Sequence, residues 1–192
     1  MKKSMLSAAV ALAFSAMGSM PAFAANDGVI NFTGSVTSVT CKVEGQAPGA
    51  NGATKDVELD GVPASNLAVA KKVANLKGFS IVVGGAGDSG CTNGTNALVR
   101  FDPSSPAIDV ASGNLNVDGW DKPEDTTTAK NVQIQLTKQD GTPINAYNEQ
   151  SDPVVIADNT AVINLGAQYY ATGAASAGAV ATRVGYMVVY AD

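Results

Sequence analysis

The sequence predicts a single all-β domain built as a sandwich. Short segments with alternating apolar and polar residues recur along the chain, and they are rich in β-branched residues. Glycine, proline, aspartate and asparagine separate these segments, as expected for tight turns between strands. About eight such strands with little helical periodicity between them are typical of an antiparallel β-sandwich.

Residues 1–24 have the three parts of a secretory leader. Lys2 and Lys3 form a charged start, Leu6 to Met17 form an apolar run, and Ala22-Phe23-Ala24 forms a small-residue cleavage signal. The apolar run is too short to cross a bilayer. We therefore expect an exported chain whose mature part, 192 less 24 or 168 residues, is large enough for one well-packed domain.

The first mature segment, residues 28–34, alternates with no proline. Gly28, Ile30, Phe32 and Gly34 fall on one face of an extended chain. Chain termini are usually polar and frayed, so an apolar strand at this position indicates that something covers it.

The remaining strands follow in order, with loops rich in glycine and small residues between them. We expect strands at residues 55–59, 78–83, 97–101, 131–137, 159–165 and 180–190, with a return strand to Ile144 completing a hairpin. Residues 67–76 are the exception, because Leu67, Ala70, Val73 and Ala74 recur at near-helical spacing, which predicts one or two helical turns. The last strand carries its apolar side chains on one face, at Val180, Thr182, Val184, Tyr186, Val188 and Tyr190. A long bare edge of this kind would promote aggregation, so this strand should be central or covered.

Charge and cysteine content restrict the function. The chain has 17 acidic and 12 basic residues and a net charge of −5, which disfavours nucleic acid as a partner. Cys41 and Cys91 are the two cysteines of an exported chain, and we expect them to form a disulfide.

Candidates for catalysis or cofactor binding are few. The chain has no histidine, which removes the commonest general base. The glycine-rich stretch Gly84 to Gly87 lacks the lysine of a phosphate loop and is better explained as a loop. Carboxylates cluster around Trp120, at Asp118, Asp121, Glu124 and Asp125. They could bind calcium or serve glycoside hydrolysis, but they lack an ordered ligand spacing, so a solvated loop is favoured. We expect no enzyme, no cofactor and no metal site.

The two chain ends resemble the type 1-like pilins of the bacterial chaperone–usher pathway. The similarity covers most of the mature chain and is specific in three places. Residues 28–34 leading to Cys41 resemble the family's N-terminal extension, and Tyr169 to Gly173 with the small-residue run after it resembles the segment before the last strand. Gly178 and Tyr190, twelve residues apart, resemble the family's C-terminal glycine–tyrosine motif.

The resemblance implies an immunoglobulin-like β-sandwich that lacks its final strand. Residues 1–24 would be the leader, 25–34 the N-terminal extension and 35–192 the pilin domain. A periplasmic chaperone would first fill the gap, and the extension of a neighbouring subunit would then replace it at an outer-membrane usher, by strand addition. The donor face would be Gly28, Ile30, Phe32 and Gly34, and the groove and chaperone contact would involve Gly178, Val184, Tyr186, Val188 and Tyr190.

The resemblance thus predicts a structural subunit, the major rod subunit of a fimbria, exported through the periplasm to the cell surface for adhesion and biofilm formation. Its partners would be other copies of itself, related subunits, the chaperone and the usher. Two alternatives remain open at this point. The chain could be a minor or adaptor subunit, or it could be a monomeric secreted or periplasmic binding protein whose N-terminal strand pairs within its own chain.

Overall fold

The computed structural model describes residues 38–47 and 53–191. The leader, residues 1–24, and the extension, residues 25–34, lie outside the described residues, so the expected domain boundaries stay predictions. Among the described residues the structure is all-β, with seven strands and one short 3₁₀ helix, η1 (Ala64–Leu67). No helix in this part of the chain has the length and apolar character that crossing a bilayer requires.

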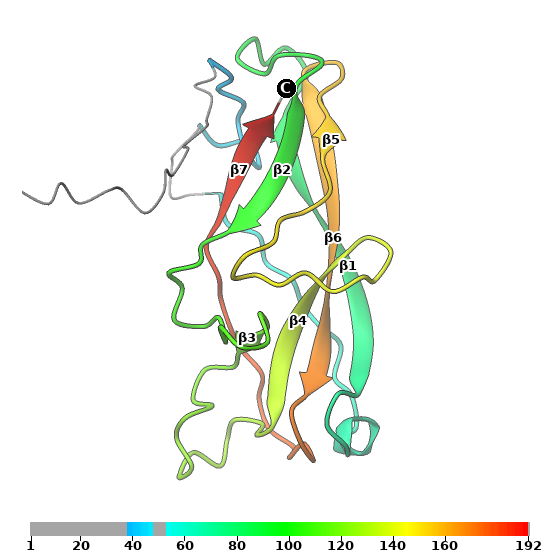
Figure 1. The fold of residues 1–192 in the computed structure, drawn as a ribbon, viewed down its shortest axis with the longest axis vertical. Coiled ribbons are helices and arrows are strands. Elements are labelled where there is room, and N and C mark those ends of the chain that lie inside the picture. The colour runs from blue at the N-terminus through cyan, green and yellow to red at the C-terminus, as the bar shows by residue number, and fades with distance from the viewer. Residues whose placement is uncertain (1–37, 48–52, 192) are drawn as a thin grey trace, which may run out of the picture. The chain divides into compact units, whose positions relative to one another are not determined.

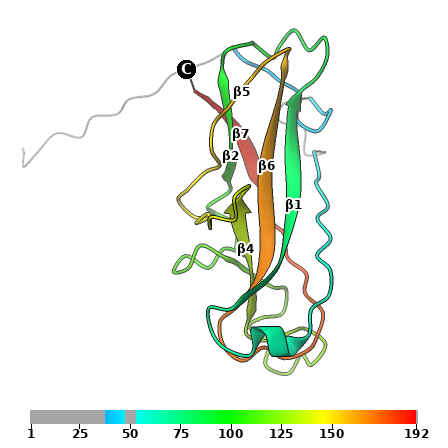
Figure 2. The same cartoon turned by 90° about the vertical axis from the view of Figure 1, so that its right-hand side faces the viewer.

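Two antiparallel sheets form the layers of a sandwich (Figures 1 and 2). The first sheet has the order β1-β6-β4-β3, with β1 (Val73–Gly84), β6 (Thr160–Ala171), β4 (Val132–Lys138) and β3 (Leu115–Asn116). The second sheet has the order β5-β2-β7, with β5 (Val154–Val155), β2 (Asn96–Phe101) and β7 (Tyr186–Ala191). The all-β sandwich predicted from the sequence is therefore confirmed.

The core lies between the sheets because alternate residues of each strand point inward. In β4, Ile134 and Leu136 face the core, while Gln133 and Gln135 lie on the outer face. These outer glutamines are also buried, and they form an amide network with Asn114 and Gln168. The network satisfies the buried amides and attaches the segment before β3 to the sheet.

The helical turns expected at 67–76 do not form, and the single 3₁₀ turn of the described residues, η1, lies just before this stretch. η1 ends at Leu67, and Val73 already belongs to β1. The near-helical spacing has another cause: β1 contains a bulge between Ala74 and Lys77, where Asn75 has a φ of 55°. A bulge shifts the inward-facing residues by one position and interrupts the period of two.

A disulfide joins Cys41 and Cys91, as expected, and both residues are fully buried. It connects the start of the described chain to the loop that follows β1. Backbone hydrogen bonds support the same connection, from Thr40 N to Gly90 O at 2.8 Å and from Gly84 N to Lys42 O at 2.7 Å. The first described segment is thereby fixed against the end of β1.

Candidate functional site

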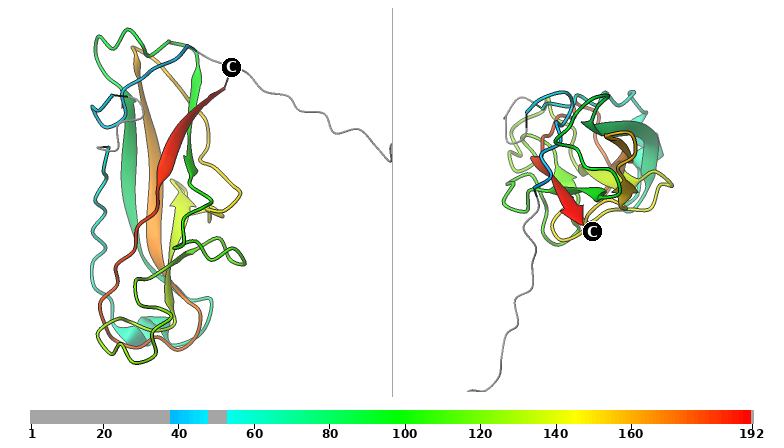
Figure 3. Two further views of the ribbon diagram at one scale, coloured as in Figure 1. Left: turned by 90° about the vertical axis from the view of Figure 1, so that its left-hand side faces the viewer. Right: turned by 90° about the horizontal axis from the view of Figure 1, so that it is seen from above.

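A groove of about 920 Å³ runs along the sandwich between two extended segments. Its walls are residues 53–59 and residues 180–188, which we call the N-wall and the C-wall. The two walls run in opposite directions on either side of the gap, as the left view of Figure 3 shows. The floor is the apolar core itself, including Ile81, Phe101, Leu115, Ile134, Leu136 and Leu165.

Within the part of the chain that the structure describes, the backbone of the C-wall is hydrogen-bonded along one edge. Its backbone accepts hydrogen bonds from Asp118 N at Ala181 O (2.7 Å) and from Asp102 N at Gly185 O (2.9 Å). Neighbouring residues of an extended chain point their N–H and C=O groups to opposite edges. The amides of Val180, Thr182 and Val184 therefore face the groove.

β7 continues this open edge. Within the described residues it is the edge strand of its sheet and pairs with β2 alone, in the register Phe101↔Tyr186 and Val99↔Val188. The sequence predicts one continuous strand over 180–190, but within the described residues regular pairing with a neighbouring strand begins only at Tyr186. Residues 180–185 keep the expected alternation, half-buried at even positions and exposed at odd ones, without a regular ladder.

The N-wall is held still less. Residues 53–60 alternate between half-buried and exposed, so Val57 and Leu59 face the groove while Asp56 and Glu58 face outward. Among the described residues this segment makes no backbone–backbone hydrogen bond. The strand predicted at 55–59 is therefore extended, but it pairs with no strand of the described residues.

One end of the groove is polar. The Tyr186 hydroxyl donates to Ala53 O across the gap at 3.0 Å. Nearby, Lys55 Nζ pairs with Glu44 Oε2 at 3.3 Å, while Glu44 Oε1 accepts a hydrogen bond from Val82 N at 2.7 Å. Burial raises the pKa of Tyr186, and the negative charge of Glu44 raises it further. Neither this cross-groove contact nor the N-wall's role as a groove wall was expected from the sequence, although the alternation at 55–59 was visible there.

The structure brings most of the predicted C-terminal residues to the groove. Val184, Tyr186 and Val188 line it, and Tyr190 packs half-buried against the core beyond it. Burial raises the pKa of Tyr190, with a smaller contribution from Asp88.

Gly178 lies just before the C-wall, and its backbone packs against residues 128–129. A Cβ added there would clash with the backbone of Thr128 and Ala129. The next residue exchanges backbone hydrogen bonds with the same stretch, from Ala129 N to Ala179 O at 2.9 Å. A close backbone approach thus explains this glycine. Gly28, Ile30, Phe32 and Gly34 lie outside the described residues.

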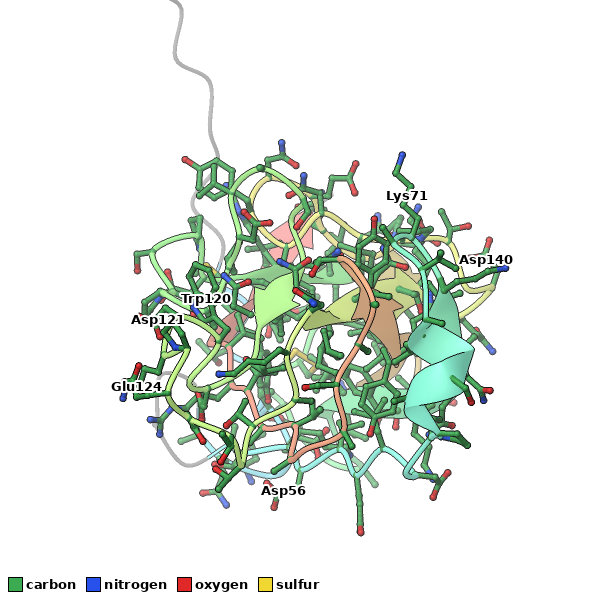
Figure 4. All side chains as sticks on the ribbon, turned by 90° about the horizontal axis from the view of Figure 1, so that it is seen from below. Asp56, Lys71, Trp120, Asp121, Glu124 and Asp140 are labelled. Carbon is green, nitrogen blue, oxygen red and sulfur yellow. A yellow bond between two sulfur atoms is a disulfide. The ribbon has the colours of Figure 1, made fainter. Side chains whose placement is uncertain are left out.

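The acidic cluster around Trp120 is organised as a loop. Asp125 accepts hydrogen bonds from the backbone and hydroxyl of Thr127 and from the hydroxyl of Thr128, which lowers the pKa of its carboxyl group. Trp120, Asp121 and Glu124 lie at the periphery of the molecule (Figure 4). In the part of the chain that the structure describes, no group of His, Cys, Asp or Glu is arranged to hold a metal ion.

Comparison with known proteins identifies the class. The chain is 34% identical to the F17 fimbrial protein of Escherichia coli over 180 residues, which cover 91% of this chain and 93% of the relative. It is 33% identical to the major fimbrial subunit SMF-1 of Stenotrophomonas maltophilia, covering 86% and 94% of the two chains. The minor fimbrial subunit HifD of Haemophilus influenzae is 31% identical, covering 89% and 77%. No protein-family model matches the chain.

Solved structures agree on the fold. The P pilus rod subunit PapA superposes with a TM-score of 0.54 at 16% identity, covering 79% of this chain and 99% of that one. A chaperone–usher pilus structure that addresses rod uncoiling gives a TM-score of 0.52 at 15% identity, covering 90% and 100%. The fold is that of an immunoglobulin-like sandwich, and among the described residues no strand lies between the two walls of the groove. Together with the sequence relatives, these features place this chain in the family of type 1-like fimbrial subunits.

Proposed function

We propose that this chain is the major rod subunit of a chaperone–usher fimbria and that it polymerises by donor-strand exchange. The observation that carries the proposal is the groove, which has an apolar floor and, along the C-wall, a backbone edge that no described residue pairs with. An extended peptide could pair with that edge and place alternate side chains on the floor, which is the general mode of β-strand addition. The donor is the extension of a neighbouring copy, with Gly28, Ile30, Phe32 and Gly34 facing the groove.

The free energy available to such a contact is large. Burial of Ile30 and Phe32 would each contribute about 1.5–3 kcal/mol. Each ladder hydrogen bond would add roughly 0.5–1.5 kcal/mol net. The half-buried side chains of the C-wall and N-wall, among them Val184, Val188 and Leu59, would become part of a closed core. Dissociation would reopen that core, so the assembled contact should be kinetically very stable.

A periplasmic chaperone is proposed as the first occupant of the same groove, before an outer-membrane usher directs the exchange. A chaperone strand would meet the same open edge and the same side chains, Val184, Tyr186 and Val188, with Tyr190 at the end of the contact. The route would run from the periplasm to the cell surface, where the fibre would serve adhesion and biofilm formation.

A minor or adaptor subunit is the second candidate. Its support is HifD, a minor fimbrial subunit that is 31% identical, whereas SMF-1, a major subunit, supports the rod assignment at 33%. Copy number separates the two: a rod subunit should be the most abundant protein of purified fibres. If this chain were present at a few copies per fibre beside a more abundant subunit, the rod assignment would be wrong.

The donor assignment is tested by placing a charge on each face of the extension. Phe32→Asp puts a carboxylate on the face proposed to be buried, which should abolish polymerisation because an unpaired buried charge is very costly. Thr33→Asp adds the same charge one residue later, on the outward face, and should still give fibres. Fibres can be counted by electron microscopy of sheared material. Normal fibres from Phe32→Asp would contradict donor-strand exchange through this face.

A further inference from the structure

A second hollow, of about 430 Å³, lies on the outer face of the first sheet, where β1 and β6 run side by side (Figure 2). We call it the outer hollow. Its floor is formed by Gly78 and Gly166, which face each other in the register of the two strands. Their neighbours Phe79 and Leu165 pack against the core, so the two glycines face outward. A Cβ built on Gly78 would have a single neighbour within 4.0 Å, the Leu165 carbonyl oxygen, so the space above this glycine is open.

A buried hydroxyl group borders the outer hollow. Thr137 of β4 lies opposite Gly166 in the register and is fully buried. Among the buried side chains that the structure describes, its Oγ1 is the one polar atom without a hydrogen-bond partner. A Cβ built on Gly166 would clash with this oxygen, so the hydroxyl points into the space over the glycine floor. An unpaired buried hydroxyl costs stability, so the threonine at this position calls for an explanation.

Leu76 covers the hydroxyl from the outside. The bulge in β1, where Asn75 has a φ of 55°, turns Leu76 onto the outer face. Its Cδ1 atom would lie 2.8 Å from the same Cβ built on Gly166, so it shares that space with Thr137. Leu76 is 48% exposed and lies outside the hydrophobic core, so its side chain can rotate at little cost and uncover the hydroxyl. Bulges commonly re-aim a side chain in this way beside a binding site.

The rim of the outer hollow carries neutral polar groups. Ser80, Gln139 and Asn164 line it, and in the described part of the chain no hydrogen bond engages their side chains. The described lining residues are all uncharged. Amide and hydroxyl groups both donate and accept hydrogen bonds, while Leu76 and the glycine floor offer a flat apolar contact. A small apolar platform with a few convergent polar groups is typical of a site for a small molecule.

We propose that the outer hollow binds a neutral sugar, one pyranose ring of a glycan. The C–H face of the ring lies on Leu76 and the glycine floor, and its hydroxyls pair with Ser80, Gln139 and Asn164. Once Leu76 has rotated, one sugar hydroxyl reaches Thr137 and provides the partner that its Oγ1 lacks. A charged ligand would find no counter-ion in this lining, which favours a neutral one. The site is on the face of the sheet opposite the groove floor, so sugar binding does not require donor-strand exchange.

Saturation-transfer NMR on the purified mature chain tests the proposal, and it works for a monomer as well as for a polymer. The probes are the methyl glycosides of glucose, galactose, mannose, N-acetylglucosamine and N-acetylgalactosamine, with N-acetylneuraminic acid as the charged comparison. We expect a Kd of about 1 mM for the best neutral probe, as for other ligands of this size.

Gly78→Val fills the open space and should abolish the signal of the neutral probes. Gly85→Val is the matched control, because a Cβ there also meets no atom within 4 Å, but Gly85 does not line the outer hollow, so the signal should persist. Should Gly78→Val not fold, Asn164→Leu, at an exposed position of β6, removes a rim amide instead and should weaken binding.

Thr137→Val separates a role in binding from a role in the fold. With Phe32→Asp in both proteins, the valine variant should unfold at a higher urea concentration, because an unpaired buried hydroxyl is removed. The same variant should bind the neutral sugar about two- to tenfold more weakly, as expected for the loss of one hydrogen bond.

Four results would overturn the proposal. The first is no signal from any neutral probe at concentrations up to about 10 mM. The second is binding that Gly78→Val, or Asn164→Leu in its place, leaves unchanged. The third is equal affinity of Thr137→Val and the parent for the sugar, which would exclude the hydroxyl from the site. The fourth is a signal from N-acetylneuraminic acid as strong as that of the neutral probes, which would exclude a neutral ligand class.

Discussion

Removing the Cys41–Cys91 disulfide should cost a large part of the subunit's stability. The bridge closes a loop with a sequence separation of 50, and both cysteines are fully buried. In the chain-entropy relation, a loop of this length contributes about 4 kcal/mol at 25 °C by restricting the unfolded chain. A domain of this size is typically stable by only about 5–15 kcal/mol. The double variant Cys41→Ala, Cys91→Ala should therefore approach the limit of folding.

The loss can be measured by urea unfolding, with Phe32→Asp in both proteins so that strand exchange does not add to the stability. The oxidised parent should have a clearly higher midpoint than the double variant, and reduction of the parent should lower its midpoint toward that of the variant. Alanine is used because a buried serine hydroxyl would add its own cost. A loss below about 1 kcal/mol would refute the entropic reasoning, and free thiols in the parent would refute the bridge.

Three further predictions concern particular residues. Gly178→Ala should lower the free energy of unfolding by about 1–3 kcal/mol, because the added Cβ would meet the Ala129 backbone. Gly61→Ala is the control and should be tolerated, because a Cβ there has no atom within contact distance. Equal unfolding midpoints for the two variants would contradict this prediction. Val188→Asp should block capture of a synthetic peptide of residues 25–37, while Met187→Asp on the more exposed face should not. If Val188→Asp left capture unchanged, this part of the groove would not be the binding site of the extension. Asp125→Asn should lower stability at neutral pH, with a gap that narrows as pH falls below about 4. The reason is that the folded-state pKa of Asp125 is lowered, so its stabilising effect is present above the unfolded value and is lost in acid. A gap independent of pH would show that ionisation of Asp125 is not involved.

The sequence predicts most of the strands because burial on one face leaves a period-2 pattern that is visible locally. β1 from Gly78, β2 and β4 coincide with alternating segments to within a residue or so, while β6 begins as predicted but continues to Ala171, beyond the predicted end at Leu165. The two-residue strands β3 and β5 were not predicted, since two residues are too few to show a period. The helix predicted at 67–76 fails for a local reason, the bulge beside Asn75.

The groove is harder to predict because it is a gap between two extended segments, with no strand of the described residues lying between them. The alternation of 180–190 indicates that the last strand must be covered. It does not reveal that, among the described residues, regular strand pairing begins only at Tyr186. The Tyr186–Ala53 contact joins residues 133 positions apart, and a backbone carbonyl leaves no signal in a sequence. The N-wall could be predicted as an extended segment but not as one side of a binding site.

Donor-strand exchange, as proposed, would join each subunit to the next by a strand. The most direct measurement is a denaturing gel of material sheared from cells that express the protein, run with and without boiling in acid. We expect a ladder of multimers that collapses to one band only after the harsh treatment, because each groove would be filled by a neighbour's extension. A single monomer band under both conditions, with the protein confined to the periplasm, would contradict it and favour a monomeric binding protein.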